Sequence, residues 1–243
     1  MKLRLDKLLL SRNLVESRQK AQALIGAGKV FVDGRRSDKV GSRIPIDSLI
    51  EIKGNDSPYV SRGGHKIAAG LDHFGIDPAG MICADFGAST GGFTDCLLQR
   101  NAARIYAVDV GYGQLAWKLR QDERVVVMER TNARHLSPAD IPEPLDLVVI
   151  DASFISLELL LGPAKTFLKP GGAILALVKP QFEVGRGQVG KGGVVRDPEL
   201  HEAAIKKIEA FGIGLGLRSR GFVSSPILGP KGNREFLIHF ILP

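Results

Sequence analysis

Four charged residues stand where their side chains could carry out proton-transfer chemistry. Asp151 and Lys179 each follow directly after an apolar run, while Lys66 and Glu235 lie in short glycine-rich or polar stretches. A lysine can accept a proton once burial or a neighbouring cation has lowered its pKa, and carboxylates can align it. Each residue alone would be a helix cap or a solvated charge. The four together favour a catalytic site.

A glycine-rich loop provides a second candidate site. It reads Asp85-Phe86-Gly87-Ala88-Ser89-Thr90-Gly91-Gly92-Phe93-Thr94. Its glycines let backbone approach a ligand closely, but the spacing is not the GxGxxG of dinucleotide sites, and no phosphate-binding lysine follows. Asp109 comes 22 residues after Gly87, where a carboxylate can accept hydrogen bonds from both ribose hydroxyls. The pattern favours a nucleoside without phosphates, and a purely structural turn is the alternative.

These side chains need elements that bring distant loops together. We expect apolar strands that alternate with helices, at 81–86, 105–109, 125–128, 145–150 and 173–178, and a last strand at 236–242. Such alternation predicts an α/β fold, a parallel sheet with helices on both faces. Ligands of doubly wound sheets bind outside the carboxyl ends of the strands, where the candidate residues stand.

The first sixty residues have a different pattern. Leu5, Leu8 and Leu9 repeat at helical spacing, and Ser17 can cap a second helix that ends at glycines. Strands at 29–32, running into the turn Asp33-Gly34, and at 49–52 complete a small α+β unit.

A polar, turn-forming stretch follows this unit, Gly54-Asn55-Asp56-Ser57-Pro58. We therefore expect a first domain at 1–56, a linker at 57–60 and a larger domain at 61–243.

Charge points to a polyanionic partner. The chain has 33 basic and 26 acidic residues, a formal charge of +7, and residues 1–60 alone hold 12 basic and 7 acidic side chains. A basic segment suits nucleic acid, because each neutralised phosphate releases condensed counterions. A merely well-solvated surface is the alternative.

Composition excludes several classes of protein. No stretch approaches the roughly 18 apolar residues of a membrane helix, and the N-terminus lacks a signal-peptide apolar region, so we expect a cytoplasmic protein. Two cysteines build neither a disulfide framework nor a four-cysteine zinc site, and no motif requires a metal.

The N-terminal segment resembles the S4 RNA-binding domain. The resemblance rests on Arg4-Leu5-Asp6, Ser17-Arg18, Leu24-Ile25, Gly28-Lys29-Val30 and Val32-Asp33-Gly34. It implies that a basic helix face and the adjacent hairpin hold structured RNA, with phosphates near Arg4, Arg12, Arg18, Lys20, Arg35 and Arg36.

The larger part resembles the Rossmann-like methyltransferases that depend on S-adenosyl-L-methionine. The resemblance implies that the glycine loop binds the methionine end of this cofactor, that Asp109 binds its ribose and that Asn132 lies by the adenine. The loop residues expected to bind the cofactor are Asp85, Gly87, Ser89, Gly91, Gly92 and Phe93.

The order Lys66, Asp151, Lys179, Glu235 resembles the tetrad of ribose 2′-O-methyltransferases of the heat-shock type. With the motifs at 60–66, 149–156 and 179–183, the whole chain is similar to the TlyA family. That family comprises ribosomal RNA cytidine-2′-O-methyltransferases, historically called haemolysins. Where some members carry Arg-x-Trp-Val, this chain has Ser57-Pro58-Tyr59-Val60.

This resemblance implies a mechanism. A ribose hydroxyl is a poor acid, so it must be held in line with the methyl group and lose its proton as the bond forms. We expect Lys179 to be the base, Lys66 to favour the neutral form of Lys179, and Asp151 and Glu235 to align lysines and hydroxyl.

Further contacts to ribosomal RNA or ribosomal subunits are expected from Arg62 and from the glycine-rich segment 183–193, with Arg186 and Lys191. We expect this segment to be a mobile loop that orders around RNA. The alternative functions are a non-catalytic RNA-binding assembly factor and a membrane-active haemolysin.

Overall fold

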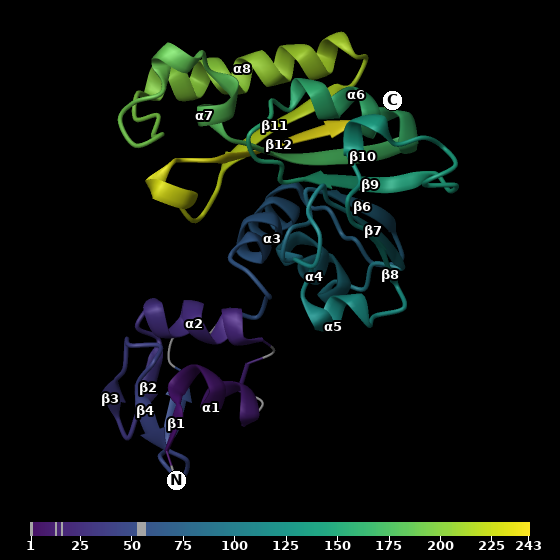
Figure 1. The fold of residues 1–243 in the computed structure, drawn as a ribbon. Helices are drawn as coiled ribbons and strands as arrows, with labels where there is room; N and C mark the ends of the chain where they lie inside the picture. Colours follow the sequence, from purple (N-terminus) through teal and green to yellow (C-terminus); the bar gives the residue numbers. More distant parts are fainter. Residues whose placement is uncertain (1, 13, 16, 53–56) are drawn as a thin grey trace. The chain divides into compact units, whose positions relative to one another are not determined.

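The computed structural model describes residues 2–12, 14–15, 17–52 and 57–243 (Figure 1). The chain divides into two units, Met1–Pro58 and Tyr59–Pro243; buried apolar side chains form one cluster in the first unit and two in the second. The expected end of the first domain, at residue 56, lies outside the described residues. The boundaries given above therefore stay a prediction.

The first unit is the expected small α+β arrangement of two helices and short antiparallel strands. Leucines of both helices pack into one core with Val30 and Ile50. The side chain of Ser17 accepts a hydrogen bond from the backbone N–H of Lys20, which confirms the predicted helix cap. The elements are β1 (Lys2–Arg4), α1 (Leu5–Ser11), α2 (Arg18–Gly26), β2 (Val30–Val32), β3 (Arg35–Arg36), β4 (Arg43–Pro45) and β5 (Ile50–Ile52).

The turn at Asp33-Gly34 takes the positive φ values that its sequence predicts, 49° and 76°. It joins β2 to β3, and β5 pairs with the other side of β2 to give the order β3-β2-β5. The strand predicted at 49–52 is β5, the second antiparallel partner of β2.

A buried carboxylate joins the two helices of this unit. Asp6 is fully buried and receives Arg4 Nε at 3.0 Å and Arg18 Nε at 2.7 Å. Hydrogen bonds from Arg4 and Arg18 hold the pKa of Asp6 well below its usual range, against the opposing effect of burial. Two of the predicted RNA-binding arginines therefore also stabilise the fold.

The second unit contains a seven-stranded sheet in the order β11-β12-β10-β9-β6-β7-β8. The five strands β10, β9, β6, β7 and β8 are parallel. Strand β12 runs antiparallel to both β10 and β11. The strands are β6 (Ile82–Phe86), β7 (Arg104–Val108), β8 (Val125–Met128), β9 (Leu145–Ile150), β10 (Leu168–Val178), β11 (Arg218–Ser224) and β12 (Phe236–Ile241).

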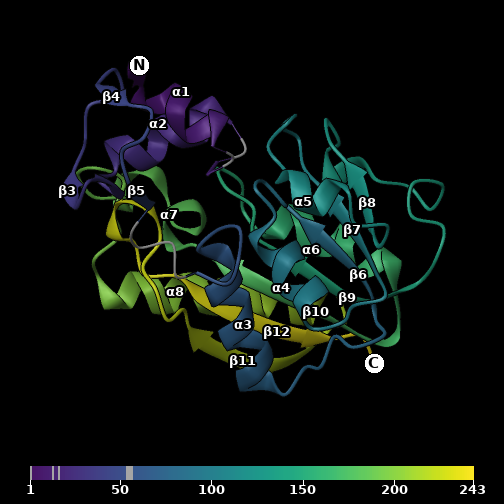
Figure 2. The same cartoon turned by 90° about the horizontal axis from the view of Figure 1, so that it is seen from below.

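Helices cover both faces of this sheet, as the α/β pattern predicts. Helices α6, α7 and α8 lie on one face and α3, α4 and α5 on the other, and Figure 2 shows the sheet from the α3 and α4 side. The helices are α3 (Gly63–Phe74), α4 (Gly92–Gln99), α5 (Trp117–Arg120), α6 (Glu158–Phe167), α7 (Pro180–Glu183) and α8 (Pro198–Gly214), with 3₁₀ turns η1 (Ala133–His135), η2 (Arg186–Gln188) and η3 (Pro230–Gly232).

Strand direction gathers the candidate residues at one edge of the sheet. Because β6, β9 and β10 are parallel neighbours, the residues that follow them, Gly87, Asp151 and Lys179, leave the sheet on the same side. Phe236, the first residue of the antiparallel β12, pairs with Val178, the last residue of β10. Glu235 therefore lies at this edge too.

His239 on β12 is a buried polar residue that the sheet does not satisfy. Its ring lies 4.9 Å from that of Phe74 on α3, and neither ring nitrogen has a hydrogen-bond partner among the described residues. Burial, and next the charge of Arg220 on β11, lower the pKa of His239 to about 4.

His239 should make stability depend on pH. Between about pH 4 and 6.5 the unfolded chain binds a proton at this ring that the folded protein does not, so acidification destabilises the folded state. The unfolding free energy of the wild-type protein relative to His239→Phe should fall on acidification, at up to about 1.4 kcal/mol per pH unit. Urea denaturation at several pH values measures this difference.

The comparison with the variant is necessary because burial raises the pKa of Asp85 to about 7, which has the opposite effect in an overlapping range. A difference between the two proteins that does not change with pH would contradict the assignment to His239.

Candidate functional site

The glycine-rich loop joins β6 to α4 and takes a conformation that requires glycine. Gly87 and Gly91 have φ values of 90° and 92°, which L side chains rarely adopt. A Cβ on Gly87 would lie 2.7 Å from the carbonyl oxygen of Asp151, and a Cβ on Gly92 would lie 2.1 Å from Ser61 Oγ. The loop thus packs its backbone directly against the neighbouring segments.

Two carboxylates hold this loop and the start of α4 by hydrogen bonds. Asp109, directly after β7, accepts hydrogen bonds from the backbone N–H of Ser89 at 2.8 Å and of Gly111 at 2.6 Å. Asp85 on β6 is fully buried, and its Oδ2 accepts from the N–H and the hydroxyl of Thr94 on α4. The Oδ1 of Asp85 has no hydrogen-bond partner among the described residues, so a buried acceptor is left beneath the loop.

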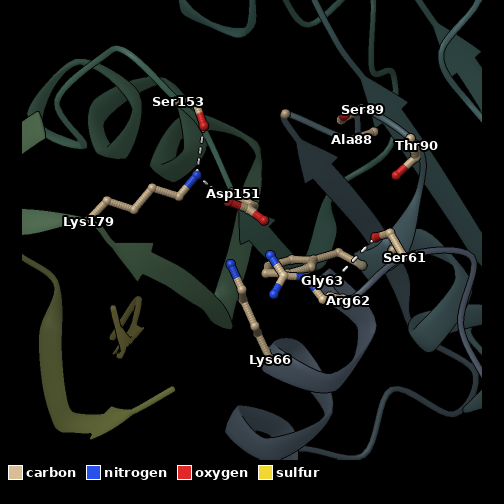
Figure 3. A pocket seen from close by; sticks show the side chains of 13 residues that line it. Ser61, Arg62, Gly63, Lys66, Ala88, Ser89, Thr90, Asp151, Ser153 and Lys179 are labelled. Atoms are coloured by element: carbon tan, nitrogen blue, oxygen red, sulfur yellow. Dashed lines mark hydrogen bonds and ion pairs between the residues drawn. The ribbon is translucent and has the colours of Figure 1, made fainter. Parts of the chain in front are cut away.

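The four charged residues form two ion pairs. Lys66 Nζ on α3 lies 2.5 Å from Glu235 Oε2, and both side chains are almost fully buried. Lys179 Nζ lies 2.6 Å from Asp151 Oδ1 and donates a hydrogen bond to Ser153 Oγ at 2.8 Å. Figure 3 shows the amino groups of both lysines directed into the space beside Asp151.

A cavity of about 270 Å³ lies between the glycine loop and these pairs. Lys66, Asp151 and Lys179 line it together with Arg62, which forms no ion pair within the described part of the chain. Glu235 is not a lining residue, but it pairs with Lys66, which is. The lining residues are Ser61, Arg62, Gly63, Lys66, Gly87, Ala88, Ser89, Thr90, Gly92, Phe93, Asp151, Ser153 and Lys179.

The residues present fit a nucleoside cofactor with a charged amino-acid end. The glycines leave open backbone where side chains would fill the space, and the unpartnered Oδ1 of Asp85 is an acceptor for a hydrogen-bond donor. Asp109 stands at the end of β7, where its carboxylate can also meet a ribose. Among the described residues no group of three or more His, Cys, Asp or Glu side chains is arranged to hold a metal ion.

Four of the predicted cofactor residues do not line the cavity: Asp85, Gly91, Asp109 and Asn132. Asn132 is the last of them in the chain. It follows β8 by a few residues, and its side-chain oxygen accepts a hydrogen bond from the backbone N–H of Arg134, capping η1. Its expected place beside an adenine stays a prediction.

The predicted RNA-binding residues of the first unit fall into two groups. Arg4 and Arg18 bind Asp6, and Arg12 donates to the carbonyl oxygens of Ser48 and Ile46. Lys20, on α2, is half-buried. The two arginines of β3 are exposed, and the guanidinium of Arg36 lies against Gly28. These two exposed side chains are Arg35 and Arg36.

The glycine-rich segment after Lys179 has more local structure than a plain loop. It contains α7, the turn η2 and an isolated bridge between Gly190 and Val194. Asn233 ties it to the loop before β12, because its amide donates to the carbonyl of Gly193 and accepts from the N–H of Val195. Lys191 is exposed, the side chain of Arg186 lies outside the described residues, and the expected mobility stays a prediction.

Sequence reasoning did not single out three side chains of this region. Ser61 and Ser153 line the cavity, and Ser153 is a direct partner of Lys179. Phe154 is 91% exposed at a φ of 65°, with its ring 5.2 Å from that of Phe182. Only their places inside the motifs 60–66 and 149–156 could have identified them.

Comparisons with known proteins agree with this architecture. Residues 59–241 match the FtsJ-like methyltransferase family, and residues 3–50 match the S4 domain. The 16S/23S rRNA (cytidine-2′-O)-methyltransferase TlyA of Mycobacterium tuberculosis is 49% identical over 236 residues, which cover 97% of this chain and 88% of TlyA.

Two solved structures have a fold similar to that of this chain. A candidate hemolysin from Streptococcus thermophilus is 44% identical with a TM-score of 0.78, covering 99% of this chain and 88% of that chain. The N-methyltransferase NodS of Bradyrhizobium japonicum, in complex with S-adenosyl-l-homocysteine, shares the fold at 16% identity and a TM-score of 0.54, covering 78% of this chain and 90% of that chain.

The mixed seven-stranded sheet, the glycine loop at its edge and the match over 59–241 define a methyltransferase of the FtsJ-like class. An S4 domain precedes it. Within that class the chain belongs to the TlyA family, which the identity over nearly its full length shows. Of the helices within the described residues, none is both long and apolar enough to cross a bilayer.

The buried pair Lys66–Glu235 should be sensitive to the loss of one partner. Glu235→Ala leaves the ammonium of Lys66 buried without its counter-charge and should lower the unfolding free energy by about 3–5 kcal/mol. The double variant Lys66→Met/Glu235→Leu removes both charges and should be close to the wild type in stability. Urea denaturation measures both, and a cost below about 1 kcal/mol for Glu235→Ala would show that solvent reaches the pair.

Proposed function

We propose that this methyltransferase transfers a methyl group from S-adenosyl-L-methionine to the ribose 2′-hydroxyl of a cytidine in ribosomal RNA, in the cytoplasm. The observation that carries the proposal is the pairing of Lys179 with Asp151 and Ser153 on the wall of a cavity whose opposite wall is the glycine loop. The name of the relative TlyA supports the substrate. The cofactor is supported by the family match and by the fold shared with NodS.

We assign separate roles in binding and catalysis to the residues of this site. The bound cofactor supplies a methyl group on a sulfonium, which is electrophilic without further activation. The glycine loop and Asp109 hold the nucleoside, and Asp85 offers its free Oδ1 beneath the loop. In its neutral form, Lys179 Nζ accepts the proton of the 2′-hydroxyl as the oxygen–methyl bond forms and the sulfur–methyl bond breaks. The carboxylate of Asp151, which lies 2.6 Å from this Nζ, then stabilises the resulting ammonium.

Lys66 has a different proposed part. Its ammonium is already matched by Glu235, so it remains a fixed hydrogen-bond donor at the cavity wall. Such a donor can hold an oxygen of the ribose in line with the methyl group. Arg62, the lining cation outside any described ion pair, is suited to a phosphate beside the target nucleotide.

RNA docking is the proposed task of the first unit. The exposed guanidinium groups of Arg35 and Arg36 can contact phosphates, which gives salt-sensitive affinity and positions the RNA without reading its sequence. Phe154 offers an exposed aromatic face next to Ser153, on which a base turned out of its helix can stack. The fully paired tetrad argues against a non-catalytic assembly factor.

Lys179→Ala should abolish transfer without abolishing binding. With radiolabelled S-adenosyl-L-methionine and ribosomal subunits from cells that lack the enzyme, the variant should lose at least about 100-fold in kcat. Its cofactor affinity should stay near that of the wild type. Label beside a cytidine that resists alkaline cleavage identifies the ribose product and the subunit.

The matched control is Lys206→Ala, which removes an exposed lysine paired with Glu202 on α8. It should be as active as the wild type. Wild-type turnover by Lys179→Ala would show that another group takes the proton. Absence of transfer by the wild-type protein, despite bound cofactor, would favour the assembly factor.

Gly87→Ala should weaken cofactor binding. The new Cβ would press on the carbonyl of Asp151 at a φ of 90°, so the loop must move away from its cavity. We expect at least about a tenfold rise in the Kd of the cofactor by isothermal titration, which corresponds to about 1.4 kcal/mol. Gly75→Ala is the control, since Gly75 also has a positive φ but open space around it at the end of α3. Equal affinities of both variants would contradict the proposed cofactor loop.

A further inference from the structure

The two segments that carry Lys179 and Asp151 are joined a second time, away from the cavity. Glu183, the last residue of α7, is almost fully buried. Its Oε2 accepts a hydrogen bond from Ser156 Oγ at 2.6 Å, and its Oε1 accepts one from the backbone N–H of Leu157 at 2.9 Å. Leu157 is the N-cap residue directly before α6, so the carboxylate fixes the end of the segment that starts at Asp151.

A lysine from a third element supports this carboxylate. Lys207 on α8 donates a hydrogen bond to the backbone carbonyl of Glu183 at 3.2 Å, and its Nζ lies 3.7 Å from Glu183 Oε2. The same ammonium pairs with Glu158 at 2.8 Å. Burial raises the pKa of Glu183, while the hydrogen bonds from Ser156 and Leu157 and the charge of Lys207 oppose that shift.

The contacts between the two segments follow the same order along both. Lys179 meets Asp151 and Ser153 at the cavity, the ring of Phe182 meets that of Phe154 at 5.2 Å, and Glu183 meets Ser156 at the far end. The short helix α7 therefore lies along the whole segment 151–157. A displacement of that segment at Glu183 would be passed to the partners of Lys179.

The segment between β9 and α6 needs such a restraint. Residues 151–156 belong to no helix or strand, so no regular backbone ladder fixes them. Phe154 within them has a φ of 65°, which is unfavourable for a bulky side chain and persists only where the surroundings hold it.

We propose that Glu183 is a positioning residue for methyl transfer: it holds segment 151–157 so that Asp151 and Ser153 stay on Lys179 Nζ. The inference rests on the proposed roles of Lys179 and Asp151. It adds that a residue without contact to the cavity controls the chemical step through both of them. Loss of Glu183 should then lower kcat and leave binding largely unchanged.

The test compares Glu183→Ala with Glu183→Gln. Glutamine keeps an oxygen that can accept from the N–H of Leu157, and its amide N–H can donate to Ser156 Oγ. Both hydrogen bonds can therefore form without the negative charge. With purified full-length protein and ribosomal subunits, Glu183→Ala should lose about 10- to 100-fold in kcat. The KM for subunits and the Kd of the cofactor should change by less than about threefold. Glu183→Gln should recover most of the lost kcat.

Two further variants make the test specific. Glu209→Ala on α8 is the matched control, because Glu209 also accepts a serine hydroxyl, that of Ser219, at 2.6 Å, but far along the chain from the cavity loops. It should keep wild-type kcat. Ser153→Ala combined with Glu183→Ala should cost much less than the product of the two single losses, since both act on the same contact of Lys179.

Each outcome decides the inference. Wild-type kcat in Glu183→Ala, a rise in KM that accounts for the loss, or independent effects of Ser153→Ala and Glu183→Ala would overturn it. If Glu183→Ala does not fold, Ser156→Ala, which removes one of the two hydrogen bonds, should still lower kcat about threefold with KM unchanged, and unchanged kcat would overturn the inference.

Failure of the proposed function is recognisable separately. A wild-type protein that transfers no methyl group would contradict the function, while backbone hydrogen exchange would still test the positioning. Exchange across 151–157 should rise in Glu183→Ala and not in Glu209→Ala. Unchanged exchange in both variants would overturn the positioning even if the enzyme is active.

Discussion

The site depends on the pairing of one antiparallel strand with the parallel part of the sheet. Parallel strands alone bring Gly87, Asp151 and Lys179 to one edge, because their carboxyl ends coincide there. Glu235 precedes its strand, so only an antiparallel β12 can bring it to that edge, and the pairing of Phe236 with Val178 does so. The ion pair of Glu235 with Lys66 then ties α3 to the sheet.

Much of this arrangement could be predicted from sequence because it follows from local pattern. The apolar runs marked six strands, and polar residues after them marked the edge at which they meet. Strand β11 was missed because it begins with three polar residues, Arg218, Ser219 and Arg220, followed by Gly221, as an edge strand allows. Its apolar residues, Phe222 and Val223, are too few to form a recognisable run.

The partners of the candidate residues could not be predicted in the same way. Ser153 and Glu183 matter through contacts that span 26 or 27 positions in the chain, and their places in the motifs 149–156 and 179–183 do not reveal those contacts. The positive φ of Phe154 likewise has no glycine or asparagine to announce it. Contacts of this kind are set by the tertiary packing of α7 against the segment after β9.

The buried Asp6 changes how the charge of the first unit should be counted. A formal tally treats every arginine as a free cation, but the guanidinium groups of Arg4 and Arg18 each already hold a carboxylate oxygen. In the polyelectrolyte description of binding, only cations that replace counterions on phosphates contribute to the salt dependence. The number of ions released when this unit meets RNA should therefore follow the uncommitted cations of its surface and fall below the number of its basic residues.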